Sequence, residues 1–121
     1  MPAPDLVFKI CPADMWAEAE ARGEFTGAPV DLADGFIHFS TTAQVRETAA
    51  RHFAGMDGLK LVAVETAALG PALKWEPSRG GDLFPHLYGA LLLSAALWVR
   101  DLPLGPDGVH VFPAELAAPP R

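Results

Sequence analysis

Histidine and hydroxyl side chains cluster in the segment that runs from Asp34 to Gln44. His38 is followed by Ser40 and Thr41, so an imidazole that titrates near neutral pH lies beside two hydroxyl oxygens. This combination suits contact with an oxygen-rich ligand or general acid–base chemistry. The alternative is that the backbone satisfies both ring nitrogens and that His38 only shapes the turn between a strand and a helix.

A second polar group lies further along the chain, where His86 and Tyr88 alternate onto the same face of a predicted strand. Glu76 precedes them in an aromatic-rich strand and is the best placed carboxylate to polarise a ligand hydroxyl. We therefore take His38, Glu76 and His86 as the candidate catalytic residues. The hypothesis requires the two imidazoles to converge on one open cleft, within about 10 Å if they are to share a ligand of nucleotide size.

A metal site is conceivable from His38, His86 and either Asp34 or Glu76, since imidazole and carboxylate groups are ordinary zinc or iron ligands. Their spacing matches no compact metal-binding signature. We therefore expect no bound metal. No glycine-rich phosphate loop is present in the sequence either.

The first half of the chain alternates between strand and helix patterns. Residues 6–10 are predicted to form a strand, and a helix is predicted to follow from Pro12 until Gly23 stops it. Residues 25–34 contain glycine, proline and aspartate and are predicted to be an irregular loop. In the next strand, 36–40, alternation places His38 and Ser40 toward a cleft, with the residues between them facing the core.

Thr41 and Gln44 have the spacing of a capping box, which predicts a helix that begins at Thr41 and ends near Gly55. Val45 and Ala49 would mark its inner face. The backbone N–H groups of residues 40–43 would then point toward the cleft, as at helix starts that hold anionic ligands.

The second half of the chain is richer in strand patterns. Strands are predicted at 59–64, 73–76, 84–88 and 109–112, and Pro85 indicates an edge position or a strand start. Residues 90–99 fit either a helix or a buried strand. We predict a single α+β domain over 1–121, with about six strands in a mixed or antiparallel sheet and two or three helices. Its core would span about 5–112, and 113–121 would be a frayed tail.

The composition limits the classes of partner. A net charge of -6 in 121 residues, without a basic run, argues against nucleic acid. The single cysteine, Cys11, excludes an internal disulfide and is predicted to be buried. With no signal-peptide pattern and no apolar stretch of membrane-spanning length, we expect a cytoplasmic protein that does not bind membranes, as a monomer or weak homodimer.

The two polar segments carry a family resemblance. Residues 34–41 with Gln44, then 74–76 and 84–89, resemble the small bacterial family known as domain of unknown function 952, over about 6–104. A remoter similarity links that family to the ADP-ribosyltransferase superfamily. It implies an ADP-ribosyltransferase-like fold with NAD as the cofactor, in which His38 takes the place of the residue that holds the nicotinamide half.

By the same resemblance Ser40 would brace the pocket, and Lys9 is the nearest counterpart of the first motif of the superfamily. Either Glu76 or His86 would stand for the glutamate of the third motif. The implied cofactor-binding residues are Lys9, His38, Ser40, Thr41 and Tyr88. Since an imidazolium would oppose the positive charge that develops on the ribose, binding can survive where transfer does not.

Three functional hypotheses remain at this stage. The first is binding of NAD or a related nucleotide, with ADP-ribose transfer left open. The second is a hydrolase or phosphotransferase that uses His38 and His86 as an acid–base pair or metal site. The third is a noncatalytic structural module in which the polar cluster only orders the sheet.

Overall fold

The computed structural model describes residues 5–117. Its architecture is α+β, as predicted, and every strand pair within these residues is antiparallel. The described part contains eight strands and four α-helices, more than expected, because several of these elements are only two to six residues long. None of the helices described in 5–117 has the length and apolar character needed to span a bilayer.

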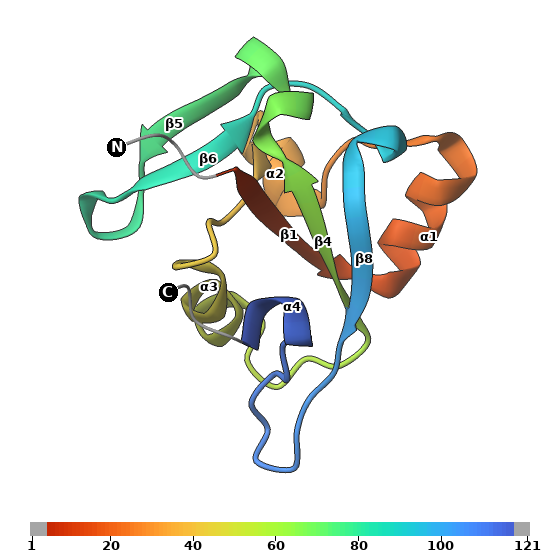
Figure 1. Cartoon of the computed structure of the whole chain (residues 1–121), viewed down its shortest axis with the longest axis vertical. Coiled ribbons are helices and arrows are strands. Elements are labelled where there is room, and N and C mark those ends of the chain that lie inside the picture. Colours follow the sequence, from red (N-terminus) through yellow and green to blue (C-terminus); the bar gives the residue numbers. More distant parts are fainter. Residues whose placement is uncertain (1–4, 118–121) are drawn as a thin grey trace.

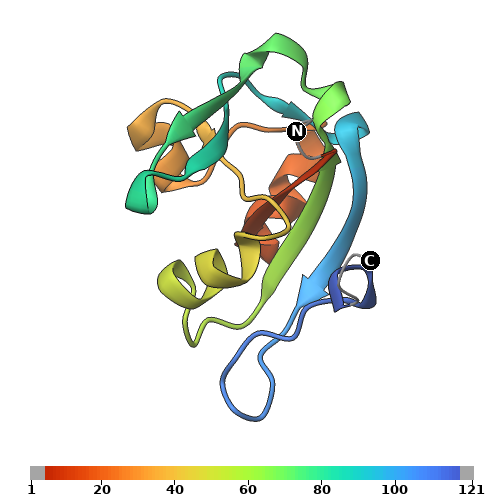
Figure 2. The ribbon, with the colours of Figure 1, turned by 60° about the vertical axis from the view of Figure 1, so that its left-hand side comes forward.

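A three-stranded sheet forms the centre of the molecule (Figure 1). Its order is β1 (Leu6–Pro12), β4 (Leu59–Glu65) and β8 (Ala96–Leu102). Helix α1 (Ala13–Arg22) covers one face, and helix α3 (Val45–His52) lies on the other, as the turned view in Figure 2 also shows. The predicted first helix is thus confirmed, including its end at Gly23.

Alternation along β1 builds a core on each side of this sheet. Val7 and Cys11 pack with Trp16 of α1, whereas Phe8 packs with Val45 of α3. Each fully buried side chain of this size stabilises the fold by roughly 1.5–3 kcal/mol. The shared β1 strand therefore fixes both helices relative to one another.

A second sheet carries the polar residues of interest. Its order is β3 (Ile37–His38), β6 (Leu83–Leu87) and β5 (Leu73–Pro77), and His38 pairs directly with His86. Ile37 is buried in the core as predicted, but Phe39, also predicted to face the core, packs there and lines the cavity as well. The predicted division of residues 36–40 into a core face and a cleft face is therefore confirmed only in part, and the strand itself is limited to Ile37–His38.

One residue joins the two sheets. Ser40 accepts a hydrogen bond from Phe8 N at 2.8 Å and donates its own N–H to Phe8 O at 2.9 Å. The segment that pairs with β6 at His38 therefore pairs with β1 two residues later. This bridge places the histidine pair beside the free edge of β1.

The predicted loop at 25–34 is wrong. Strand β2 (Glu24–Phe25) pairs with β7 (Leu91–Leu92), and Pro29–Asp34 forms helix α2. Pro29 stands in the first turn of that helix, where its missing N–H costs nothing, and Gly35 ends it with φ of 87°. Pro29 and Gly35 therefore mark the two ends of a helix, whereas the loop prediction took proline and glycine in this region as residues that interrupt regular structure.

The edge position inferred from Pro85 is also wrong, because β6 is the central strand of its sheet. In an antiparallel pair the N–H and C=O of one residue point to the same neighbour. Pro85 O accepts from Phe39 N at 3.0 Å, so the missing N–H falls on the same side, just beyond the end of the two-residue strand β3. A ladder hydrogen bond is therefore lost only where the ladder stops.

Helix α3 begins at Val45 rather than at Thr41. Gln44 Oε1 accepts the backbone N–H of Thr41 at 3.0 Å, which is one half of the predicted capping box, but residues 42–44 form a turn. Because the N–H of Ser40 bonds Phe8 and that of Thr41 bonds Gln44, neither is directed at a ligand. The predicted anion-holding helix start is thus wrong for two of the four N–H groups, those of Ser40 and Thr41.

The last part of the chain differs most from expectation. The strand predicted at 109–112 is wrong, since only an isolated bridge joins His110 to Leu104. Residues Ala114–Ala117, within the tail expected to fray, form helix α4, and Arg46 donates to Leu116 O at 2.6 Å. Residues 118–121 of the predicted tail lie outside the described residues. Short 3-10 helices complete the chain at Thr66–Ala68, Gly70–Ala72, Arg79–Gly81 and Leu93–Ala95.

Candidate functional site

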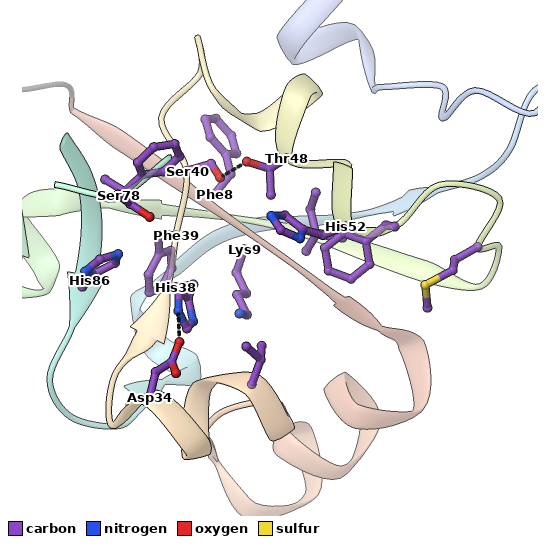
Figure 3. Close-up of a pocket in the computed structure, with 15 residues that line it drawn as sticks. Phe8, Lys9, Asp34, His38, Phe39, Ser40, Thr48, His52, Ser78 and His86 are labelled. Atoms are coloured by element: carbon purple, nitrogen blue, oxygen red, sulfur yellow. Dashed lines mark hydrogen bonds and ion pairs between the residues drawn. The ribbon is translucent and has the colours of Figure 1, made fainter. Parts of the chain in front are cut away.

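The imidazole rings of His38 and His86 lie 5.5 Å apart, centroid to centroid, with their planes at 72°. Both line a cavity of about 540 Å³ between the second sheet, the edge of β1 and helix α3 (Figure 3). The predicted convergence of the two rings is therefore confirmed. The chemical roles given to them remain predictions.

The cavity has largely apolar walls with a few polar groups. The apolar lining includes Phe8, Phe39, Phe53, Met56 and Phe84, and the polar lining includes Lys9, Asp34, His38, Ser40, Ser78 and His86. Pockets of this composition bind organic ligands through apolar contact and use the few polar groups for orientation.

Asp31 is the group that holds His38 in place. Its carboxylate is only 1% exposed, yet it sits at the centre of helix α2 facing the sheets. It accepts the backbone N–H of His38 at 3.0 Å and faces Nδ1 of the same residue at 2.6 Å. Lys9 Nζ lies 2.8 Å from its other oxygen, which also accepts the N–H of Ala28 at 2.8 Å.

These contacts set the ionisation of the buried carboxyl. Burial alone would raise the pKa of Asp31, but the hydrogen bond from His38 and the charge of Lys9 outweigh it and lower the pKa from 3.8 to about 2. Lys9 is itself 5% exposed, so its charge is neutralised inside the protein rather than offered to a ligand.

The second ring nitrogen of His38 meets another carboxylate. Its Nε2 lies 2.9 Å from Asp34 Oδ2, at the end of α2 (Figure 3). An ionised carboxylate can only accept hydrogen bonds, so a ring that donates to two of them at once must carry a proton on each nitrogen. The geometry therefore favours the doubly protonated form of His38, held between Asp31 and Asp34.

His86 has a different environment. Its Nδ1 lies 2.8 Å from Glu76 Oε1, and Tyr88 donates its hydroxyl to the same oxygen at 2.8 Å. The hydrogen bonds from His86 and Tyr88 lower the pKa of Glu76. The bond to Glu76 in turn raises the pKa of Tyr88. Because Nδ1 is engaged by Glu76, Nε2 is the ring nitrogen of His86 through which it would contact a ligand.

Phe36 packs between these groups. Its ring stacks on His86 at a centroid distance of 4.1 Å and lies 4.7 Å from His38. Tyr88 contacts the same ring at 5.2 Å. The aromatic ring therefore adds packing contacts to the hydrogen bonds that orient the two imidazoles.

The remaining predicted site residues divide into two groups. Ser40 lines the cavity, but its Oγ is paired with Thr48 Oγ1 at 2.8 Å and its backbone bonds Phe8, so these groups are engaged within the wall. Thr41, Glu76 and Tyr88 are not among the lining residues. Tyr88 and Glu76 act on the cavity only through His86 and Phe36.

The sequence reasoning missed the residues that support the histidines. Asp31 lay in a segment interpreted as a loop, although Pro29 and Gly35 bracket it with helix signals. Phe36, within the predicted strand 36–40, had no predicted role. His52 also lines the cavity, whereas His110 is buried with Nε2 2.7 Å from Met56 O.

Two further features bear on the chemistry. Among residues 5–117, no three His, Cys, Asp or Glu side chains are grouped to hold a metal ion. Cys11 is fully buried, and that burial raises the pKa of its thiol to about 11. The thiol is therefore placed in the core as predicted and lies away from the cavity lining.

The backbone of β1 also faces the cavity. Successive residues of an antiparallel strand direct their N–H and C=O groups to opposite sides. Phe8 directs both groups to Ser40, so Ile10, two residues on, directs its own pair to the same side, where it lines the cavity. A ligand there would meet an amide donor and a carbonyl acceptor side by side.

Residues 10–99 match the model of a protein family described as "Protein of unknown function (DUF952)". The chain belongs to the DUF952 family. The matched range includes His38, Glu76 and His86, and the family predicted from these segments is therefore confirmed. No curated protein matches this DUF952 chain.

Solved structures of protein CC0527 from Caulobacter crescentus are similar to this DUF952 protein. Its crystal structure has 50% sequence identity and a TM-score of 0.88, covering 93% of this chain and 99% of that chain. Its solution NMR structure has 53% identity and a TM-score of 0.78, covering 86% and 90%. None of these descriptions names an ADP-ribosyltransferase, so that remoter resemblance stays a prediction.

Proposed function

We propose that the chain binds NAD or a related nucleotide in the cavity between its two sheets. The observation that carries the proposal is the convergence of His38 and His86, 5.5 Å apart, on a cavity of about 540 Å³. This volume lies within the roughly 300–1,000 Å³ of sites that enclose small organic ligands.

The walls suit a flat heterocycle. Phe8, Phe53 and Phe84 line the cavity with aromatic rings, on which a base or a nicotinamide ring can pack. The backbone of Ile10 directs one donor and one acceptor to the same side, which matches the oxygen and the NH₂ of a carboxamide. This match favours nicotinamide over a heterocycle that lacks an amide.

The polar groups suit the sugar and phosphate parts of such a ligand. The imidazolium of His38 is a charged donor, and charge-assisted hydrogen bonds to oxyanions are about twice as strong as neutral ones. His86, fixed through Nδ1 by Glu76, can use Nε2 toward a ribose hydroxyl. Together they offer one contact for an anion and one for a hydroxyl.

The proposal is limited to binding and includes no transfer of ADP-ribose. Breaking the bond between nicotinamide and ribose builds positive charge that needs a nearby carboxylate. Glu76 is engaged by His86 and Tyr88 outside the cavity lining, and the lining carboxylate, Asp34, is paired with the positive ring of His38. Neither carboxylate is positioned to stabilise that charge.

Isothermal titration with NAD and with ADP-ribose tests the proposal. We expect saturable binding by the native chain and roughly two- to tenfold weaker binding by His86→Ala, the effect of one lost hydrogen bond. His110→Gln, whose histidine lies outside this cavity, is the matched control. Absence of heat at millimolar ligand, with circular dichroism showing an intact fold, would refute it.

One observation favours a second function, a phosphoester hydrolase. His86 is oriented by a carboxylate through Nδ1, as general bases commonly are, and the two carboxylate contacts of His38 opposite it favour a proton on both of its nitrogens. Two imidazoles held in different protonation states can act as base and acid in one reaction.

In that reaction His86 Nε2 would take a proton from water as the water oxygen bonds to phosphorus. The bond between phosphorus and the leaving oxygen would break, and His38 Nε2 would give that oxygen its proton. Hydrolysis of bis(p-nitrophenyl) phosphate should then show a bell-shaped pH profile and be lost in both His38→Ala and His86→Ala. A rate equal to that of the buffer alone would exclude this second function.

A further inference from the structure

The two carboxylates that hold His38 differ in how firmly they are fixed. Asp31, on the Nδ1 side, is 1% exposed and receives hydrogen bonds from Lys9, Ala28 and the His38 backbone. Asp34, on the Nε2 side, has a side chain that is 48% exposed and lines the cavity. The Nδ1 contact is therefore built into the fold, whereas the Nε2 contact borders the space that a ligand would enter.

Breaking the contact between His38 and Asp34 also costs less free energy than breaking the contact between His38 and Asp31. An ion pair between partly exposed groups contributes little to stability, because water replaces each partner when they separate. Asp31 has no such alternative, since a buried carboxylate without its donors is strongly destabilising. A competing ligand would thus displace Asp34 and leave the contact between His38 and Asp31 in place.

The position of Asp34 Oδ2 defines what the competitor must be. This oxygen lies 2.9 Å from Nε2 and accepts its proton, so the arriving atom must be an acceptor and is best an anionic oxygen (Figure 3). A phosphate oxygen satisfies both requirements. Before it is displaced, the negative charge of Asp34 repels such a ligand.

We propose that the Nε2 edge of His38 is the phosphate subsite of the cavity, that Asp34 occupies it when no ligand is bound, and that a ligand diphosphate displaces Asp34. The inference deepens the nucleotide-binding function and rests on it for the class of ligand. It makes Asp34 a competitor of the ligand, so that removing its charge strengthens binding.

The test compares Asp34→Asn with the native chain in titrations with ADP-ribose, inorganic pyrophosphate and uncharged adenosine. We expect about fivefold tighter binding of the two diphosphates, the effect of removing one like charge at the site, and no change for adenosine. Glu20→Gln removes the same charge from the exposed face of α1 and should change none of the three affinities. Equal or weaker diphosphate binding by Asp34→Asn would overturn the proposal.

A second measurement separates this proposal from the nucleotide function. Nitrogen-15 NMR of the histidine side chains reports on Nε2 of His38 directly, and pyrophosphate should shift that signal in the native chain and at lower concentration in Asp34→Asn. If this shift occurs while NAD and ADP-ribose do not bind, the nucleotide function fails and the phosphate subsite stands. If pyrophosphate shifts the signal in neither protein, the subsite fails whatever NAD does.

Discussion

The carboxylate of Asp31 accepts the backbone N–H of His38 at 3.0 Å and lies 2.6 Å from the ring Nδ1 of the same residue. Lys9 reaches the same carboxylate from β1. Three elements of the fold therefore meet at one buried group, and the candidate site depends on the packing that brings them together.

Removing the Asp31 carboxylate should destabilise the fold strongly. In Asp31→Ala, Lys9 stays buried without its partner, and breaking a buried pair in this way typically costs about 3–5 kcal/mol. Urea unfolding measures the loss. Asp101→Ala removes a surface pair with Lys60, where we expect at most about 1 kcal/mol. Equal losses in the two variants would contradict the central role of Asp31.

Stability should fall steeply in acid. The pKa of Asp31 is about 2 in the folded chain against 3.8 otherwise, so folding favours the ionised form. The resulting stabilisation is fully present above about pH 4 and is lost as the pH falls from about 4 to 2, by about 2 kcal/mol. Urea midpoints across this range measure it. In Asp31→Asn the same titration should give a visibly shallower decline.

Tyr88 is the only tyrosine, so its titration can be followed without interference from another phenol. The hydrogen bond to Glu76 raises the pKa of Tyr88 in the native chain. In Glu76→Gln the negative charge is gone, and the pKa should return toward its ordinary value near 10. Phenolate absorbance against pH measures the change. An unchanged curve would show that the Glu76 contact does not persist in solution.

Cys11 should react with thiol reagents only when the chain unfolds. Its side chain is fully buried, so reagents cannot reach the sulfur. The pKa of the thiol is raised to about 11, so very little of the reactive thiolate is present at neutral pH. Cys11 should therefore react far more slowly in the native protein than in concentrated urea. The absorbance released by a chromogenic disulfide reagent measures the two rates. Rapid modification of the native chain, at a rate independent of added urea, would argue against this burial.

The sequence predicted the parts of the site that follow from local alternation. Ile37 faced the core, His38 and His86 lay on the faces that alternation gave them, and β1, α1 and β4 fell where the patterns placed them. These features depend on a period of two or 3.6 residues, whereas the pairing of His38 with His86 also required β3 and β6 to meet.

The residues that the sequence did not reveal are those whose role depends on distant partners. Asp31 stabilises the site because Lys9, 22 residues earlier, is buried against it, and nothing in the local pattern marks that pairing. Pro85 looked like an edge residue, since its tolerance in a central strand depends on where β3 ends. Such relations are fixed by tertiary packing, which local propensity does not encode.

The triad of Lys9, Asp31 and His38 has a consequence for how related chains can diverge. A buried charge without its counter-charge is costly, so a substitution at either end of the Lys9–Asp31 pair would select for a compensating one at the other. We therefore expect positions 9 and 31 to covary among homologues, with lysine and aspartate gained or lost together. Chains that have lost both should carry a neutral hydrogen-bond acceptor beside the first histidine, or no histidine there at all.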